Sequence, residues 1–387
     1  MKKKFKVSLL GWVAIAIAGG ILLGQILPAS IARLFVTFNA LFGNFLSFAI
    51  PLIILGLVAP AIGELGKGAG RLLVITTLIA YGSTLFSGFF TYFSGSIVLP
   101  QILDQSASLT AIENPEDFML MPYFTLEMPP LMAIMTSLLL AFVIGLGLSS
   151  IKGNTLQACF TDFRDIIMRL IQSVIVPLLP LHIFGIFLNI TVSGQVAVII
   201  MMFLKVIAFI FVLHIALLLI QFMTAGAIAK KNPFKMLKNM MPAYLTALGT
   251  QSSAATIPVT LRQILKMGVR ENIAVFTVPL CATIHLAGST LKIVACAMAI
   301  MMMVGEPVSI TQFSGFIMML GITMVAAPGV PGGAIMAALG LLGSMLGFNE
   351  TMQALMIALY IAMDCFGTAC NVTGDGAIAT VMDRIAK

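Results

Sequence analysis

The sequence predicts an all-α polytopic membrane protein with about eight transmembrane helices and two re-entrant helical hairpins. Of its 387 residues, 60% are hydrophobic and only 9% are charged, whereas soluble domains carry roughly a quarter charged residues. Apolar runs long enough to cross a bilayer recur along the whole chain. The Lys and Arg residues form short clusters between these runs, which indicates a role in membrane orientation rather than nucleic-acid binding.

Six apolar runs fill the first half of the chain, and each is expected to form one membrane-spanning helix. The first, 7–27, follows a lysine cluster and is too long for a cleavable signal peptide. The other five runs cover residues 35–62, 72–99, 131–148, 166–190 and 196–227. Several exceed the roughly 20 residues that a span needs, so tilted or kinked helices are expected.

The basic residues predict the orientation of the chain in the cytoplasmic membrane of the cell. The segment 100–130 carries five acidic residues and no Lys or Arg, as an exterior loop would. The basic clusters lie on the other side of the alternating spans, which is the cytoplasmic side by the positive-inside rule. These clusters include Lys2, Lys3, Lys4, Lys6, Lys67, Arg71, Lys152, Arg164, Arg169, Lys230, Lys231, Lys235 and Lys238. Both termini are therefore expected to be cytoplasmic.

Beyond Lys238 the apolar segments become shorter and are interrupted by small polar residues. Residues 232–268 are flanked by basic residues at both ends and break near Gly249 to Ser253, so they are expected to enter and leave on the inside. Residues 310–348 break at 327–333 and have acidic flanks on the outside. Each is predicted to be a re-entrant hairpin, oriented oppositely to the other, whose tip must face a wet or protein-buried region. A helix follows each hairpin, at 270–304 and 351–385, which predicts inverted repeats.

Polar residues on these two helices mark the candidate site. Asp364, Thr368, Asn371 and Asp375 follow steps of four, three and four, which places them on one helix face. The two Asp residues are eleven positions apart, or about 16 Å along a helix, so two neighbouring sites are expected. A carboxylate in an apolar span is a functional candidate by default. On the preceding helix, His285, Ser289 and Lys292 share a face in the same way.

Four segments resemble the dicarboxylate/amino acid:cation symporter family, which includes the glutamate transporters and their prokaryotic homologues. They are 251–259 at the first hairpin tip, 279–289, 329–333 at the second tip and 371–375. The resemblance implies a secondary active transporter rather than an enzyme, with elevator-type alternating access and a homotrimeric assembly. It also implies that residues 1–226 are mostly scaffold, with the third and sixth helices joining a transport core of residues 227–387.

The resemblance implies a substrate site in which Asp364 holds an ammonium group and Asn371 holds a carboxylate. The remaining residues implied are Ser252, Ser253, Gly329, Gly367 and Thr368. Members that carry acidic substrates have an Arg where this chain has Gly367. The preferred prediction is therefore a neutral amino acid such as serine, threonine, alanine or cysteine. A dicarboxylate or other carboxylate, with Lys292 as its counter-charge, remains an alternative.

The residues implied for cation coupling are Ser83, Thr84, Thr283, His285, Lys292, Asn371 and Asp375. Asn371 and Asp375 are the candidate sodium ligands, and no other cofactor is indicated. Many members read Asn-Met-Asp-Gly-Thr where this chain reads His285-Leu-Ala-Gly-Ser289, so two sodium-serving side chains are lost. Lys292 is expected to replace an ion near Ser83 and Thr84, or to act as a counter-ion to Asp375. Proton coupling is an alternative because histidine titrates near neutral pH.

Two other classes of function fit the sequence less well. A channel or a receptor is disfavoured because closed hairpins around a polar site do not suit an open pore. An intramembrane hydrolase with Ser253 as nucleophile is disfavoured because no His or Asp in that segment could activate the hydroxyl group.

Overall fold

The computed structural model describes residues 9–66, 71–103, 120–194, 196–327 and 331–386, and all regular structure among them is helical. The first half contains α1 (Leu9–Gly24), α2 (Ala29–Gly66), α3 (Arg71–Ile102), α5 (Ile134–Ser150), α6 (Thr155–Leu170), the π-helical turn η2 (Ile171–Ile175), α7 (Val176–Val192) and α8 (Val196–Ala229). The second half contains α9 (Pro233–Thr250), α10 (Ser253–Lys266), α11 (Glu271–Ile284), α12 (Ala287–Met303), α13 (Ile310–Val325), α14 (Gly333–Leu346), α15 (Glu350–Ala362) and α16 (Asp364–Ile385).

The lengths of these helices confirm a polytopic membrane protein. Among the described residues, five helical segments are long and apolar enough to cross a bilayer: 29–63, 72–102, 155–192, 196–229 and 271–303. The bent pair α15–α16 is a sixth candidate. Of the eight spans expected, the remaining two correspond to α1 and α5, which are apolar but only 16 and 17 residues long.

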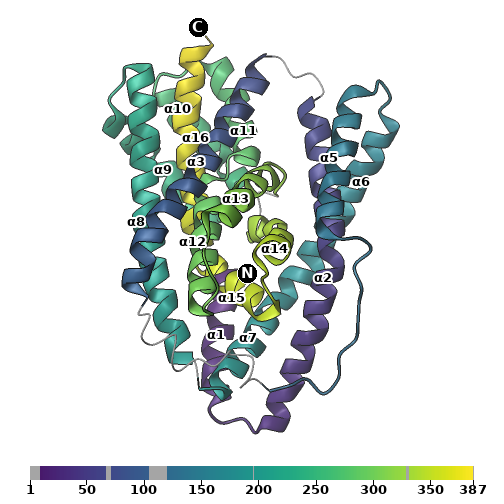
Figure 1. Cartoon of the computed structure of the whole chain (residues 1–387). Coiled ribbons are helices and arrows are strands. Elements are labelled where there is room, and N and C mark those ends of the chain that lie inside the picture. Colours follow the sequence, from purple (N-terminus) through teal and green to yellow (C-terminus); the bar gives the residue numbers. More distant parts are fainter. Residues whose placement is uncertain (1–8, 67–70, 104–119, 195, 328–330, 387) are drawn as a thin grey trace, which may run out of the picture.

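The helices pack in two groups (Figure 1). In the first group α2 packs against α5, α6 and α7, and α1 packs against α7. In the second, α12 packs against α3 and α16, while α16 also contacts α8, α9, α10 and α11. Helices α14 and α15 contact both groups. The roles of scaffold and transport core remain a prediction for these groups.

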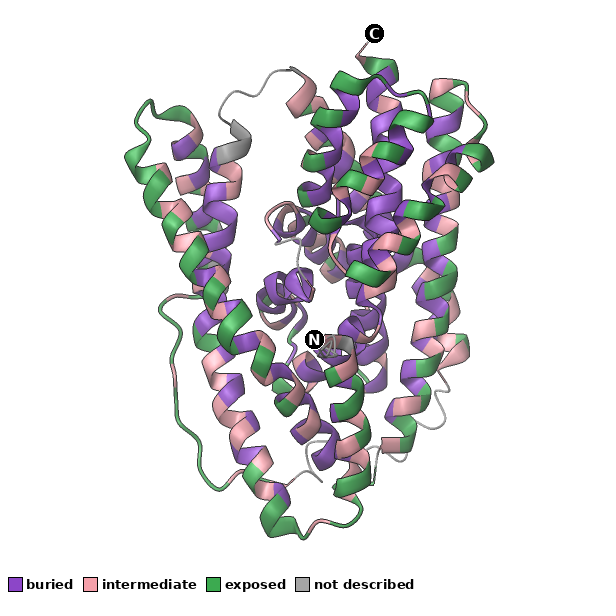
Figure 2. Ribbon diagram, turned by 180° about the vertical axis from the view of Figure 1, so that it is seen from behind, coloured by how far each residue is buried: buried purple, intermediate pink, exposed green. Residues whose placement is uncertain are grey.

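Helices α12, α14 and α16 are buried along almost their whole lengths, and exposed residues lie mainly on the outer helices (Figure 2). Because of this burial, the ionisable and amide side chains of α12 and α16 need partners inside the protein, although the Thr290 and Thr373 hydroxyl groups have none among the described residues. A buried polar group without a partner costs several kcal/mol in an apolar surrounding, roughly 2–7 kcal/mol for a hydroxyl or amide.

Both segments predicted as hairpins form pairs of packed helices, α9 with α10 and α13 with α14. The first turn is built by Gln251 in the left-handed region (φ +53°) and by Ser252, whose hydroxyl oxygen accepts from the Ala255 amide to cap α10. The second turn reaches α14 through Gly332, whose φ of +73° suits glycine. Residues 328–330, including Gly329 of the predicted substrate site, lie outside the described residues.

The two helices after the hairpins, expected as continuous at 270–304 and 351–385, are each interrupted. Helix α11 ends at Ile284 and α12 begins at Ala287, while α15 and α16 meet at Met363 with a bend of 61°. An interruption frees backbone groups, which other parts of the protein must satisfy. The order of a helical hairpin followed by a broken helix therefore occurs twice, at α9–α12 and at α13–α16.

Candidate functional site

The first cluster is an ion pair between Lys292 on α12 and Asp364, the first residue of α16. The Lys292 Nζ atom lies 3.1 Å from Asp364 Oδ1 and 3.4 Å from the Met363 carbonyl oxygen, to which it donates. It also stands 3.6 Å from the centre of the Tyr360 ring, a cation–π contact. The Lys292 side chain is 0% exposed. The ammonium group therefore has three partners inside the protein: a carboxylate, a carbonyl oxygen and an aromatic ring.

Gly367 provides the space for this ammonium group. A β-carbon at position 367 would contact Lys292 Cε and would lie 2.6 Å from Lys292 Nζ, closer than such atoms can approach. A side chain at position 367 therefore requires the end of the Lys292 side chain to move. Gly367 predicts the loss of a cationic side chain from this position, but the amino group of Lys292, from α12, lies there.

Asp364 links this ion pair to the second hairpin. Its Oδ2 atom accepts a hydrogen bond of 2.8 Å from the Gly332 amide, at the start of α14. The carboxylate also lies at the N-terminus of α16, where the helix dipole favours negative charge. Because both oxygens already have partners, a substrate ammonium group would have to share Asp364 with Lys292 or displace it.

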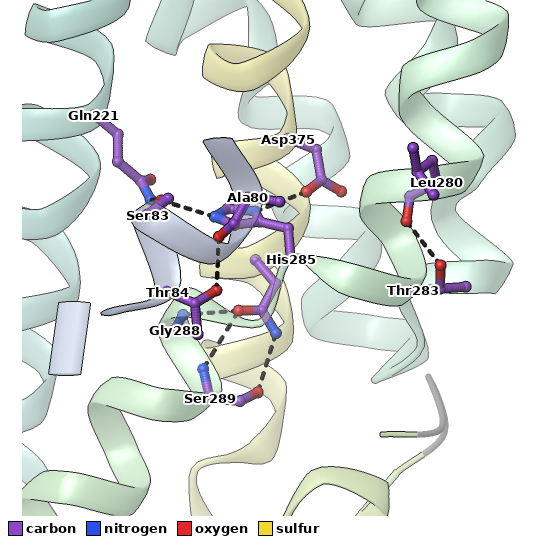
Figure 3. Close-up of polar contacts among 11 residues, drawn as sticks. Ala80, Ser83, Thr84, Gln221, Leu280, Thr283, His285, Gly288, Ser289 and Asp375 are labelled. Atoms are coloured by element: carbon purple, nitrogen blue, oxygen red, sulfur yellow. Dashed lines mark hydrogen bonds and ion pairs between the residues drawn. The ribbon is translucent and has the colours of Figure 1, made fainter. Parts of the chain in front are cut away.

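The second cluster surrounds Asp375, further along α16 (Figure 3). Asp375 Oδ1 lies 2.9 Å from Nδ1 of His285, and Nε2 of the same ring lies 3.1 Å from the Ser83 hydroxyl oxygen. Ser83 also accepts a hydrogen bond of 3.0 Å from the Gln221 amide. The His285 side chain is 0% exposed. Residues from α3, α8, the α11–α12 break and α16 thus form one hydrogen-bonded chain.

Asn371 lies between the two clusters and ties α16 to the start of α12. Its Oδ1 atom accepts from the Gly288 amide at 2.7 Å and from the Ser289 amide at 3.3 Å. Its Nδ2 atom donates to the Ser289 hydroxyl oxygen at 3.0 Å. The amide oxygen of Asn371 therefore caps backbone groups that the helix break leaves without an intrahelical partner.

The two Asp residues lie in separate clusters, as their spacing predicts, but the pairing of the basic residues differs from the expectation. Lys292 was expected near Asp375 or near the hydroxyls of Ser83 and Thr84. Lys292 instead pairs with Asp364, and the His285 ring contacts both Asp375 and Ser83. The physical reason is the helix break, since His285 adopts an extended conformation (φ −103°, ψ 97°) and leaves the helical face of Lys292.

The other residues of the predicted sites are spread more widely. The Thr84 hydroxyl group donates to the Ala80 carbonyl oxygen in its own helix. Thr283 is exposed, donates to the Leu280 carbonyl oxygen and points away from the cluster in Figure 3. Ser253 and Thr368 are buried near the starts of α10 and α16. Their part in binding a substrate or an ion stays a prediction.

Sequence reasoning missed two partners on α8. Gln221 binds Ser83, and His214, expected only to pack, lies 3.0 Å from the Gly288 carbonyl oxygen through Nε2. The two residues are seven positions apart, which is two helical turns on one face of an otherwise apolar run. This spacing is a signal that could have identified them. Nothing comparable marks the Gly332 amide or the Tyr360 ring.

This chain is similar to one known protein family along almost its whole length. The model of the sodium:dicarboxylate symporter family matches residues 9–385. An excitatory amino acid transporter of Caenorhabditis elegans is 26% identical over 302 residues, which cover 75% of this chain and 58% of that protein. Human excitatory amino acid transporter 2 is 29% identical over 161 residues, covering 41% of this chain and 28% of that protein. Mouse excitatory amino acid transporter 3 is 32% identical over 161 residues, covering 41% and 31%. The matched part thus spans from 28% to 58% of these relatives.

Proposed function

The chain belongs to the sodium:dicarboxylate symporter family, and from this premise we propose that it is a secondary active symporter for a small carboxylate-bearing solute. Family membership argues for a transporter and against an enzyme. Transport across the cytoplasmic membrane, with both termini inside, is part of the proposal. So are the homotrimer and the elevator-type alternating access that the resemblance implies.

The observation that carries the substrate class is the position of the Lys292 ammonium group. It is a buried cation at the start of α16, in the space that a side chain at position 367 would need. Its longest hydrogen bond is the one of 3.4 Å to the Met363 carbonyl oxygen. A substrate carboxylate would replace that contact and form a charge-assisted hydrogen bond with Nζ, which is stronger than a bond to a neutral acceptor.

The Lys292–Asp364 pair argues against a substrate that is recognised through its ammonium group alone. Asp364 already accepts from Lys292 and from the Gly332 amide. A dicarboxylate or another carboxylate without an ammonium group can bind Lys292 while Asp364 keeps both partners. We therefore favour this class over the neutral amino acid preferred from the sequence.

A neutral amino acid is the second candidate, because the contact between Nζ and Oδ1 is the contact that a substrate ammonium group would make. At 3.1 Å, Lys292 holds Asp364 through one oxygen only. A zwitterion could bind across the ion pair, with its ammonium group on Asp364 and its carboxylate on Lys292.

Uptake into proteoliposomes separates the two candidates. The panel contains succinate, malate, lactate, aspartate, serine and alanine, with inward sodium and pH gradients applied separately. For the carboxylate proposal we expect succinate or malate to be transported and Lys292→Met to abolish this uptake, while the exposed control Lys266→Met keeps it. Uptake of serine or alanine with no uptake of any dicarboxylate would refute the carboxylate proposal and support the second candidate.

A further inference from the structure

We propose that the His285 side chain occupies the position beside Asp375 where a sodium ion was expected, and that no sodium ion binds there. The family implies a sodium ion as coupling ion, and the sequence pointed to Asn371 and Asp375 as its ligands. The proposal concerns these residues of the transporter proposed above, but its main test does not depend on the transported solute.

Three of the oxygen atoms that could hold the ion already lie in hydrogen bonds: Asn371 Oδ1, Asp375 Oδ1 and the Ser83 hydroxyl oxygen. A hard cation needs several oxygen ligands with free lone pairs. The Asn371 amide oxygen accepts from two backbone amides, which use both of its lone pairs. Asp375 Oδ1 faces His285 Nδ1, and the Ser83 hydroxyl oxygen accepts from Gln221. These are the contacts of a hydrogen-bonded network rather than of a metal site.

The neighbouring candidate ligands do not complete a sodium site either. The Thr84 hydroxyl group is bound within its own helix to the Ala80 carbonyl oxygen. Ala287 has no side-chain oxygen, and its carbonyl oxygen accepts a hydrogen bond of 2.6 Å from Ser87. The exposed Thr283 side chain points away from Asp375 (Figure 3). Gln221 Oε1 is a buried oxygen atom near His285 without a hydrogen-bond partner among the described residues, but one such atom is fewer than the several oxygen ligands that a hard cation needs. The residues present therefore do not fit a sodium ion at this position.

The imidazole ring of His285, in contrast, has contacts at both of its nitrogen atoms and at Cε1. When Asp375 is ionised it only accepts hydrogen bonds, and His285 Nδ1, 2.9 Å from Asp375 Oδ1, is then the donor. Its other nitrogen is held by Ser83, and through Ser83 by Gln221. A β-carbon at Gly374 would lie 2.8 Å from His285 Cε1 and 2.7 Å from Gln221 Oε1, so the ring and the amide fill that space. A nitrogen donor thus stands against the carboxylate where the sodium ion was expected.

The same arrangement occurs at two carboxylates of α16. Lys292 contacts Asp364, and His285 contacts Asp375. Each carboxylate has a nitrogen partner from the α11–α12 region. We therefore expect this protein to bind fewer sodium ions than a family member in which neither of these two carboxylates has a nitrogen partner from the protein.

The first test uses the three histidines of the chain as spectroscopic probes. Protein labelled with ¹⁵N-histidine is reconstituted in nanodiscs without substrate, and the ring signals are assigned with His182→Gln, His214→Gln and His285→Gln. We expect the His285 ring signals to be the same in sodium chloride and in choline chloride at equal ionic strength. A saturable, sodium-specific change of the His285 signals that Asp375→Asn abolishes would overturn the proposal.

The second test rebuilds the family's sequence pattern with His285→Asn and Ala287→Asp in one chain. We expect sodium chloride, compared with choline chloride, to raise the unfolding temperature of this double variant, since a ligand stabilises the state that binds it. We expect any sodium-dependent rise of the unfolding temperature to be the same in the wild type and in Asp375→Asn. A sodium-dependent rise in the wild type that Asp375→Asn removes would contradict the assignment. Neither test measures uptake, so the failure of the carboxylate proposal would be seen separately in the transport panel.

Discussion

At the scale of single residues, Asp364 and Asp375 are tolerated inside α16 because each has a partner that is charged or can donate a hydrogen bond. An unpaired charge inside a membrane protein is costly, whereas a pair with satisfied hydrogen bonds is tolerated. Lys292 and Asp364 are both buried, at 0% and 6% side-chain exposure. Loss of one member should therefore harm the protein more than loss of both.

This asymmetry gives the first prediction. Lys292→Met leaves Asp364 as an uncompensated buried charge and is expected to reduce the free energy of unfolding by about 3–5 kcal/mol. The double variant Lys292→Met, Asp364→Asn should recover most of that loss. Thermal unfolding of purified protein in detergent measures both. Equal stability of the wild type and Lys292→Met would show that the ion pair is not formed.

Gly367 gives the second prediction. An added methyl group in Gly367→Ala would come within 2.6 Å of Lys292 Nζ, so the lysine end must shift from its place beside Asp364. We expect a lower unfolding temperature and weaker uptake of the carboxylate substrate. The matched control is Gly147→Ala, where an added β-carbon meets nothing within 4 Å. If the two alanine variants behave alike, Lys292 does not occupy this space.

At the scale of elements, the breaks at His285–Leu286 and at Met363 decide which residues meet, and the sequence did not reveal them. Neither break contains a proline or a glycine, the usual local signals of interruption. The freed backbone groups are satisfied by residues from other helices instead, such as Asn371 for the start of α12. The hairpins, in contrast, could be predicted because their turns carry small polar residues and glycines.

The third prediction tests the cap that Asn371 provides for α12. Asn371→Leu leaves the Gly288 and Ser289 amides without this acceptor, and each buried unsatisfied group costs about 1–3 kcal/mol. Ser289→Ala removes only the hydroxyl that accepts from Asn371 Nδ2 and should cost about 1 kcal/mol. Chemical or thermal unfolding in detergent compares the two. A milder effect of Asn371→Leu than of Ser289→Ala would contradict this role.

At the scale of the whole molecule, composition and the four motifs were enough to predict the membrane class and the family. They could not predict the internal pairs Lys292–Asp364 and His285–Asp375, because these join residues 72 and 90 positions apart in the chain. The direction in which the side chains approach depends on how α12 packs against α16 and α3. Spacing along one helix therefore placed Lys292 with His285, near the Ser83 and Thr84 hydroxyls or Asp375, whereas it pairs with Asp364.

The fourth prediction concerns the orientation of the molecule in the membrane. Cys159 on α6 is exposed, whereas Cys281, Cys296 and Cys370 are buried and Cys365 is half-buried. Cys159 lies between the basic residues Lys152 and Arg164, on the side expected to be cytoplasmic. A membrane-impermeant maleimide should label it in inside-out vesicles and not in intact cells, and Cys159→Ser should remove the label. Labelling from outside intact cells would reverse the proposed orientation.

The central claim is that Lys292 supplies the cation that recognises a substrate carboxylate, and moving that cation to α16 tests it most directly. The variant Lys292→Ala removes the ammonium group, and Lys292→Ala with Gly367→Arg places a guanidinium at the position where acidic-substrate members carry one. The measurement is uptake of radiolabelled succinate and malate by both variants and by the wild type, at equal amounts of reconstituted protein. We expect uptake to be lost in Lys292→Ala and measurably restored in the double variant. Wild-type uptake of these solutes by Lys292→Ala would contradict the claim.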